Sequence, residues 1–363
     1  MSVETIIHMF PAQQDALFDK LMEVAQGVQP ELFIETPLFI SKIEELKGAF
    51  LKDSARVADI AELLFHQDIT AYGPRATAVF ERWATEGGSP SMPALVAHAM
   101  NHFKIEAQSP YVPVLLMAAL LAEYPNELQY HGNEHYRKVL FHVIRLTATH
   151  NDLFARSEWF LSPDEVARLL IASCIHDLGH EGGDNQRDGI YTPGYMEQRA
   201  FNVARPYFEA LGLDKKSQGE IETMVFCTDI TFFAGDNSPC LRMKKIYKHY
   251  FWDDNSEDVS LMLMGKLRRY EDNPQLAQMA MILHESDIGT SAGLSYEQTI
   301  KETLNIMGER GQNSAGPQTV LAFLREQLGE TMFTEAGKQV FGSEMVNIVD
   351  HAESDVRAGR KQF

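Results

Sequence analysis

The stretch VARLLIASCIHDLGHEGGDN, residues 166–185, joins an apolar run directly to a cluster of histidine, aspartate and glycine residues. The apolar half has helical spacing and predicts a buried helix. A charged aspartate at the end of such a helix is costly unless a cation or hydrogen bonds compensate its charge. Two interpretations follow: either Asp177 belongs to a cation-binding site, or the polar residues form a helix end in solvent.

Helical periodicity extends along the rest of the chain. Apolar residues recur at three- and four-residue spacings in 15–28, 55–66 and 345–360, whereas alternating, strand-like runs are scarce. Two helix starts have a capping serine, at Ser162 and Ser295, with glutamate or glutamine three residues later. The sequence therefore predicts an all-α protein, a bundle of many helices.

A Gly-, Ser- and Pro-rich stretch, TEGGSPSMP at 85–93, is the clearest candidate linker. It divides the chain into an N-terminal helical segment, residues 1–84, and a main domain, residues 94–345. The first segment is interpreted either as a regulatory cap or as part of the main domain.

The composition limits the partners that we expect. The chain has 363 residues with 51 acidic and 32 basic side chains, a net charge of −19, so its surface repels nucleic acid and anionic membranes. The longest apolar run, residues 111–124, is too short to span a bilayer. No signal peptide is evident, and the three cysteines form no CxxC pair, so we expect a reducing, cytoplasmic location.

Two histidine pairs and a distant aspartate suggest a metal site. His131 and His135 lie four residues apart in a predicted helix at 130–146, as do His176 and His180 in the opening stretch. Asp287 follows the apolar helix LAQMAMIL and supplies a further carboxylate at a helix end. Histidine and aspartate together suit Zn²⁺, Mn²⁺, Fe²⁺ or Mg²⁺. The alternative for the first pair is a solvated helix start, and His142 and His150 are expected to be structural.

These residues resemble the motifs of the HD superfamily of metal-dependent phosphohydrolases, most closely the catalytic domains of class I cyclic nucleotide phosphodiesterases. The segment from His131 to His135 is similar to the family's H-N-x-x-H, and the segment from His176 to Asn185 fills H-D-x-x-H-x-G-x-x-N. The resemblance covers about residues 130–325, in the family's order. Three further segments continue the resemblance, YMEQRAFNV with Glu197, MVFCTDIT with Asp229 and SDIG with Asp287.

The resemblance implies a role for each matching residue and a 3′,5′-cyclic nucleotide phosphodiesterase active in signal transduction. One metal, Zn²⁺ or Fe²⁺, would be held by His135, His176, Asp177 and Asp287. Asp177 would also bridge to a second metal, Mg²⁺ or Mn²⁺, and a hydroxide between the metals would attack phosphorus. His131 would be the general acid. The residues expected to orient water are His180, Glu197 and Asp229, and Gln318 is the expected purine contact.

Three alternatives stay open from the sequence. Asp229 can equally serve helix capping or structural pairing. The chain can be another phosphohydrolase of the superfamily, acting on a nucleotide or dinucleotide, or a non-catalytic signalling module of the HD type. In every enzymatic case we expect a small anionic phosphodiester or related phosphate as the substrate, no nucleic-acid or membrane partner, and we leave a homodimer open.

Overall fold

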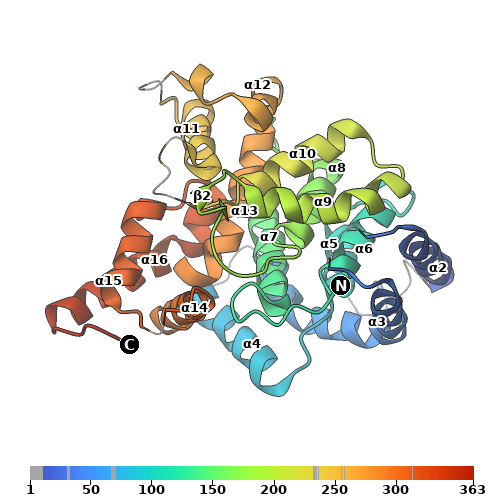
Figure 1. The fold of residues 1–363 in the computed structure, drawn as a ribbon, viewed down its shortest axis with the longest axis horizontal. Helices are drawn as coiled ribbons and strands as arrows, with labels where there is room; N and C mark the ends of the chain where they lie inside the picture. The colour runs from blue at the N-terminus through green and yellow to red at the C-terminus, as the bar shows by residue number, and fades with distance from the viewer. Residues whose placement is uncertain are drawn as a thin grey trace.

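A computed structural model describes residues 11–30, 33–66, 71–231, 235, 237–254, 256, 258–312 and 314–363. Helices dominate these residues, and the sequence prediction of an all-α fold is confirmed (Figure 1). The described strands are two residues each, β1 (Gln186–Arg187) and β2 (Ile190–Tyr191), and they form one antiparallel hairpin.

The α-helices follow one another along the chain with mostly short connections. They are α2 (Pro11–Gly27), α3 (Thr36–Phe65), α4 (Tyr72–Glu86), α5 (Met92–His102), α6 (Tyr111–Leu121), α7 (Asn133–Leu153), α8 (Pro163–Ile175), α9 (Tyr195–Ala210), α10 (Lys215–Phe226), α11 (Pro239–Phe251), α12 (Arg269–Asp272), α13 (Pro274–Ala292), α14 (Tyr296–Glu309), α15 (Pro317–Ala322) and α16 (Glu335–Arg357). Two short 3₁₀ segments, η2 (Val259–Leu261) and η3 (Gly265–Arg268), precede α12, and a π-helical segment, η4 (Phe323–Leu328), follows α15.

Helix α7 lies at the centre of the molecule (Figure 1). It packs against α13, α8, α16, α3 and α5. Its residues from Val139 to Ala148 are buried almost without interruption, as expected for a helix surrounded on all sides. This central helix and its neighbours α8 and α13 carry the residues of the predicted site.

The N-terminal helices share the hydrophobic core of the rest of the chain. One continuous cluster of buried apolar side chains extends from Phe18 in α2 to Ala352 in α16. Helix α3 packs on α5 and α7, and α4 packs on α16. The predicted division into 1–84 and 94–345 stays a prediction, but these contacts join the two parts through a common core, and α16 extends beyond 345.

The predicted helix starts at the two serines are confirmed. Ser162 caps α8 in a capping box, in which its hydroxyl accepts from Glu165 N while the Glu165 carboxylate accepts from Ser162 N. Ser295 caps α14 by accepting from Gln298 N at 3.1 Å. Local sequence therefore sets these helix boundaries.

Two other boundaries differ from the sequence prediction. Helix α7 begins at Asn133, so His131 lies before the helix and not within it. The Asn133 side chain bonds the backbone of Asn126 and Ala122, which fixes the chain as it enters the helix. Helix α13 continues to Ala292, so Asp287 lies inside the helix and not at its end, because its polar residues find partners on neighbouring helices.

Within the described residues, no helix combines the length and apolar character needed to cross a bilayer.

Candidate metal centre

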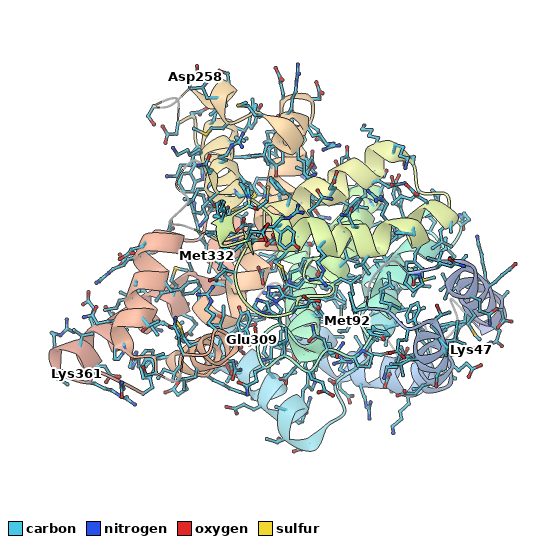
Figure 2. The ribbon with its side chains drawn as sticks, in the orientation of Figure 1. Lys47, Met92, Asp258, Glu309, Met332 and Lys361 are labelled. Atoms are coloured by element: carbon cyan, nitrogen blue, oxygen red, sulfur yellow. The ribbon has the colours of Figure 1, made fainter. Side chains whose placement is uncertain are left out.

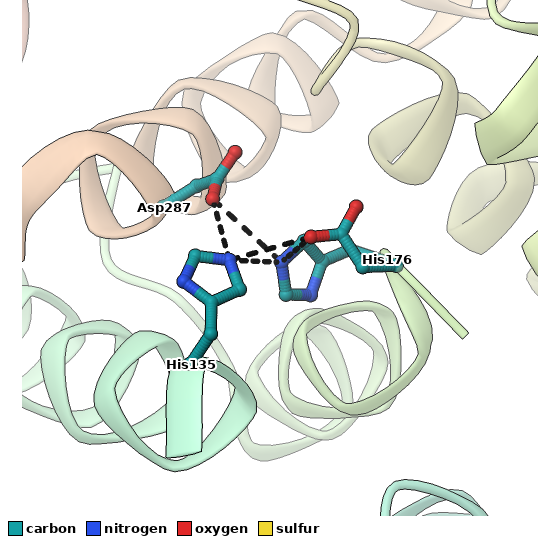
Figure 3. A group of neighbouring side chains, drawn as sticks. His135, His176 and Asp287 are labelled. Atoms are coloured by element: carbon teal, nitrogen blue, oxygen red, sulfur yellow. Dashed lines mark hydrogen bonds and ion pairs between the residues drawn. The ribbon is translucent and has the colours of Figure 1, made fainter. Parts of the chain in front are cut away.

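Four side chains from three parts of the fold bring one donor atom each to a common point. They are His135 from α7, His176 and Asp177 from the end of α8, and Asp287 from α13. Figure 3 shows the two imidazoles and the Asp287 carboxylate turned toward one another. The structure thus brings together the four residues that the sequence singled out as metal ligands.

The distances among these donor atoms match the spacing of ligands around one ion. His135 Nε2 lies 3.3 Å from His176 Nε2 and 3.2 Å from Asp287 Oδ1. Asp177 Oδ2 lies 3.3 Å from His135 Nε2 and 3.2 Å from His176 Nε2. Ligands about 2.0–2.2 Å from a tetrahedral metal stand about 3.3–3.6 Å apart. The group could therefore hold a divalent metal ion.

The tautomer of His176 strengthens this fit. Its Nδ1 lies 2.8 Å from the carbonyl oxygen of Ser173, which can only accept, so Nδ1 carries a proton and donates. In the neutral ring, Nε2 then carries a lone pair and no proton, and this lone pair faces the carboxylate oxygens of Asp177 and Asp287. Acceptors that face acceptors in a buried site need a cation between them, either a proton or a metal ion.

The electrostatics of the four residues are strongly coupled. Burial lowers the pKa of His176, but the charges and hydrogen bonds of Asp177 and Asp287 together outweigh burial and hold that pKa well above its ordinary value. Burial raises the pKa of Asp177, and His176 and His135 reverse this and hold it well below its ordinary value. The site therefore retains two carboxylate charges, and a metal ion would compete with protons for the imidazoles.

A tight turn presents Asp177 to the cluster. Helix α8 ends at Ile175, and Leu178 N donates to Ile175 O while His180 N donates to Asp177 O. The turn requires Gly179, whose φ is 76°. Tyr136 of α7 donates its hydroxyl to Asp177 O at 2.6 Å and ties the turn to the central helix.

A second cluster stands next to the four donors and consists of His131, His180 and Glu309. Glu309, at the end of α14, accepts from His131 Nδ1 at 2.6 Å, and its other oxygen accepts from the backbone N–H groups of Tyr130 and His131. Figure 2 shows Glu309 near the middle of the molecule. The pair between His131 and Glu309 fixes the orientation of the imidazole.

The geometry of this second cluster does not suit a shared metal ion. The rings of His131 and His180 are stacked, with centroids 3.7 Å apart and 15° between their planes, so their in-plane lone pairs lie in nearly parallel planes and cannot both point at one ion. His180 Nδ1 accepts from Gly182 N. Burial, and then the charge of His131, lowers the pKa of His180 to about 4, so His180 is a neutral ring beneath His131.

Glu197 has a buried carboxylate whose charge interacts with that of Asp177. Its Oε1 accepts from Asn185 at 3.2 Å, whereas its Oε2 is buried and has no hydrogen-bond partner among the described residues. Burial, followed by the charge of Asp229, raises the pKa of Glu197 well above its ordinary value, and Asp177 adds to this shift. An unsatisfied buried oxygen that interacts with the charges of two aspartates is what a bound, hydrated cation would relieve.

Asp229 has structural partners. Its carboxylate accepts from the Tyr191 hydroxyl and from Gly194 N, both at 2.8 Å, and from Thr231 N at 3.0 Å. These bonds fix the hairpin and the start of α9, as the structural-pairing interpretation expected. A role in orienting water stays a prediction.

The remaining candidates lie outside both clusters. Gln318 is the second residue of α15 and its side chain is exposed, so the predicted purine contact stays a prediction. His142 bonds the Tyr72 hydroxyl and Thr290, and His150 bonds Trp159 O, which are structural partners as expected. Glu285, the acid nearest Asp287 in sequence, instead accepts from the backbone of Thr334 at the start of α16.

Glu309 is the site residue that sequence reasoning missed. It lies 178 positions from His131 in the chain, at the end of an ordinary amphipathic helix. No local pattern separates it from the other glutamates of that helix.

A scan against protein-family models finds no match for this chain, and a search of curated proteins finds no similar sequence.

Proposed function

We propose that the chain is a metal-dependent phosphohydrolase, and specifically a 3′,5′-cyclic nucleotide phosphodiesterase. The main support for the proposal is that two kinds of histidine lie next to each other, one kind in a cluster of metal-type donors and the other paired with a carboxylate. Four donor atoms within 4.8 Å of one another suit a metal ion, and beside them His131 stands outside that group, oriented by a carboxylate. Its ring centroid lies 6.0 Å from that of His135.

The residues divide the chemistry between them. His135, His176, Asp177 and Asp287 would hold a first metal, Zn²⁺ or Fe²⁺, and the second oxygen of Asp177 would face a second, Mg²⁺ or Mn²⁺. Divalent cations held there would neutralise phosphate oxygens and lower the pKa of water. Glu197, through its unpartnered oxygen, would accept a hydrogen bond from water bound at the metal site.

His131 is the proposed proton donor to the departing sugar oxygen. Because Nδ1 donates to Glu309, Nε2 is the nitrogen that can carry the second proton toward a substrate. Glu309 stabilises the protonated ring, in the way that a carboxylate behind a catalytic imidazole generally does. Neutral His180 lies flat beneath the ring and keeps it from tilting without adding a like charge.

The charge of the chain also supports an anionic phosphate as the substrate. A protein with a net charge of −19 repels anions over most of its surface. Cations bound at the donor cluster would create a local positive field, so a small phosphodiester would be attracted only there. The cyclic nucleotide itself is proposed from the motif resemblance at 131–135 and 176–185.

A substrate screen tests the proposal. Purified protein is loaded with Mn²⁺ or Zn²⁺ and assayed for hydrolysis of cyclic mononucleotides, cyclic dinucleotides and nucleoside triphosphates, with Asp287→Asn as the control. We expect release of the nucleoside monophosphate from a cyclic mononucleotide and none from the control. Hydrolysis of only another class would replace the cyclic mononucleotide by that substrate. No hydrolysis of any class by metal-loaded protein would contradict the proposed enzyme.

A further inference from the structure

A buried ion pair, formed by Lys138 and Glu302, lies beside the site without belonging to either histidine cluster. Lys138 Nζ donates to Glu302 Oε1 at 2.9 Å, and the side chains are 6% and 5% exposed, respectively. Gln298 also donates to Glu302, and Glu134 lies 3.4 Å from the Lys138 ammonium. Glu302 and Gln298 belong to α14, whereas Lys138 and Glu134 belong to α7.

This ion pair and the pair between His131 and Glu309 are separated by the same number of residues on both segments. His131 to Lys138 and Glu302 to Glu309 both span seven positions, which on α14 is close to two helical turns. The first residue of one segment contacts the last of the other, so the two segments run antiparallel with charged contacts seven positions apart. His135, a proposed metal ligand, lies between the two contacts in sequence.

Helix α14 meets the segment around α7 at these two charged contacts. It packs on α13, α16 and α15, and the contacts described above reach α7 through long side chains. Apolar packing is non-directional, so by itself it specifies the register of a helix only loosely. A buried charge on α14 restricts a shift along the helix axis, because it must meet its partner.

Such an ion pair is a poor source of stability. Removing two charges from water costs about as much as their attraction returns, so buried pairs are retained most clearly where they select one geometry. Burial lowers the pKa of Lys138, but Glu302 and Glu134 outweigh burial and raise it, so Lys138 stays charged. An apolar pair of similar volume would fill the same space and would leave the register of α14 unspecified.

We infer that Lys138 and Glu302 are positioning residues, which hold α14 in the register that brings the Glu309 carboxylate to His131 Nδ1. The inference rests on the proposed function, in which His131 donates a proton. The geometric part is separate, because the hydrogen bond between His131 and Glu309 can be measured in protein without metal or substrate.

The test observes that hydrogen bond directly. A proton held between imidazole Nδ1 and a carboxylate gives a strongly downfield proton resonance, which histidine-specific ¹⁵N labelling of the full chain makes visible. The variants His131→Asn and Glu309→Gln assign it by removing it. We expect Lys138→Met and Glu302→Gln to remove or shift the resonance, and Lys138→Arg to retain it.

Two further variants separate positioning from stability. Lys138→Met/Glu302→Met removes both charges, so we expect a folded protein whose resonance is nevertheless lost. Arg137→Met is the matched control, because Arg137 neighbours Lys138 on α7 but pairs with the buried carboxylate of Glu123, away from α14. We expect it to lower stability and leave the resonance in place.

Kinetics give a second, independent result. Lys138→Met should lower kcat by about 10- to 100-fold with little change in KM, since a small misplacement of a reacting group has effects of that size. In a Glu309→Gln background the same substitution should lower kcat no further, because both changes act through His131.

An unchanged resonance in folded Lys138→Met or in the double variant would overturn the inference. So would equal loss of the resonance in Arg137→Met, which would show a general disturbance of α7. If no substrate is hydrolysed while the resonance behaves as expected, the proposed function fails and the positioning of Glu309 stands.

Discussion

The ring of Phe33 occupies the space that a side chain at Gly179 would need. A β-carbon at position 179 would stand 2.2 Å from Phe33 Cε1, well inside van der Waals contact. Phe33 comes from the segment between α2 and α3, and Gly179 from the turn that presents Asp177 to the metal cluster. The N-terminal part of the chain therefore supports the candidate site directly.

The first prediction concerns this contact. Gly179→Ala should lower the free energy of unfolding by more than about 1 kcal/mol, because the residue has a φ of 76° and the methyl group would meet the aromatic ring. Metal affinity should fall as well, since the turn carries Asp177. Chemical denaturation and metal titration measure both effects.

The same loop offers a matched control for that variant. Gly183 has a φ of 91°, but a β-carbon there would have no neighbour within 4 Å. Gly183→Ala should show only the backbone cost and should bind metal normally. If Gly179→Ala behaved no differently from Gly183→Ala, the contact with Phe33 would have no importance for the site.

The second prediction concerns metal content. Asp177→Ala should abolish bound metal and activity, because Asp177 contributes to the four-donor cluster and is the proposed bridge to the second metal. Elemental analysis of purified protein measures the loss. Asp184 lies in the loop that follows Asp177 and pairs with Arg310. Asp184→Asn should therefore retain metal. Full occupancy in Asp177→Ala would refute the assignment.

The third prediction separates His131 from His135. His135→Ala should cost metal and activity together, whereas His131→Ala should keep metal and fold and lower kcat by about 10²–10⁴, the usual contribution of a positioned acid. The loss should shrink for a p-nitrophenyl phosphodiester, whose leaving group needs no proton. Equal slowing of natural and activated substrates, with metal retained, would make His131 a binding residue and not the acid.

The fourth prediction concerns stability at acid pH. His98, buried between α5 and α3, bonds Ser54 O at 3.0 Å, and burial lowers its pKa from 6.5 to about 4 despite that bond. Between these two values the unfolded chain binds the proton and the folded chain does not. His98 should therefore reduce the free energy of unfolding as pH falls from 6.5 to 4, by up to about 1.4 kcal/mol per pH unit.

A substitution that keeps the hydrogen bond isolates this contribution. His98→Gln retains a donor for Ser54 O and should reduce the slope of stability against pH in that window, as measured by urea unfolding at several pH values. His351→Gln, at an exposed position on α16, should leave the slope unchanged. Identical slopes for wild type and His98→Gln would contradict the prediction.

Local signals in the sequence determined the class of fold and the starts of two helices. Helical periodicity predicted the all-α architecture, and the serine caps of α8 and α14 are where the sequence placed them. These features depend on residues within a few positions of one another, so they can be recognised without the fold. The predicted boundaries of α7 and α13 were wrong, the first because Asn133 bonds the preceding loop and the second because Asp287 finds a partner on another helix.

The candidate ligands could also be chosen from the sequence, because His135, His176 and Asp177 stand in recognisable local spacings and Asp287 in a short matching segment. Their convergence on one point is a result of how α7, α8 and α13 pack. The pairing of His131 with Glu309, 178 positions away, and of Lys138 with Glu302, 164 positions away, was decided only by the tertiary structure. The local sequence around a glutamate on an amphipathic helix does not indicate its partner. The packing of α14 beside α13 brings the glutamate within reach of α7. Because both charges of the pair are then buried, they must contact each other.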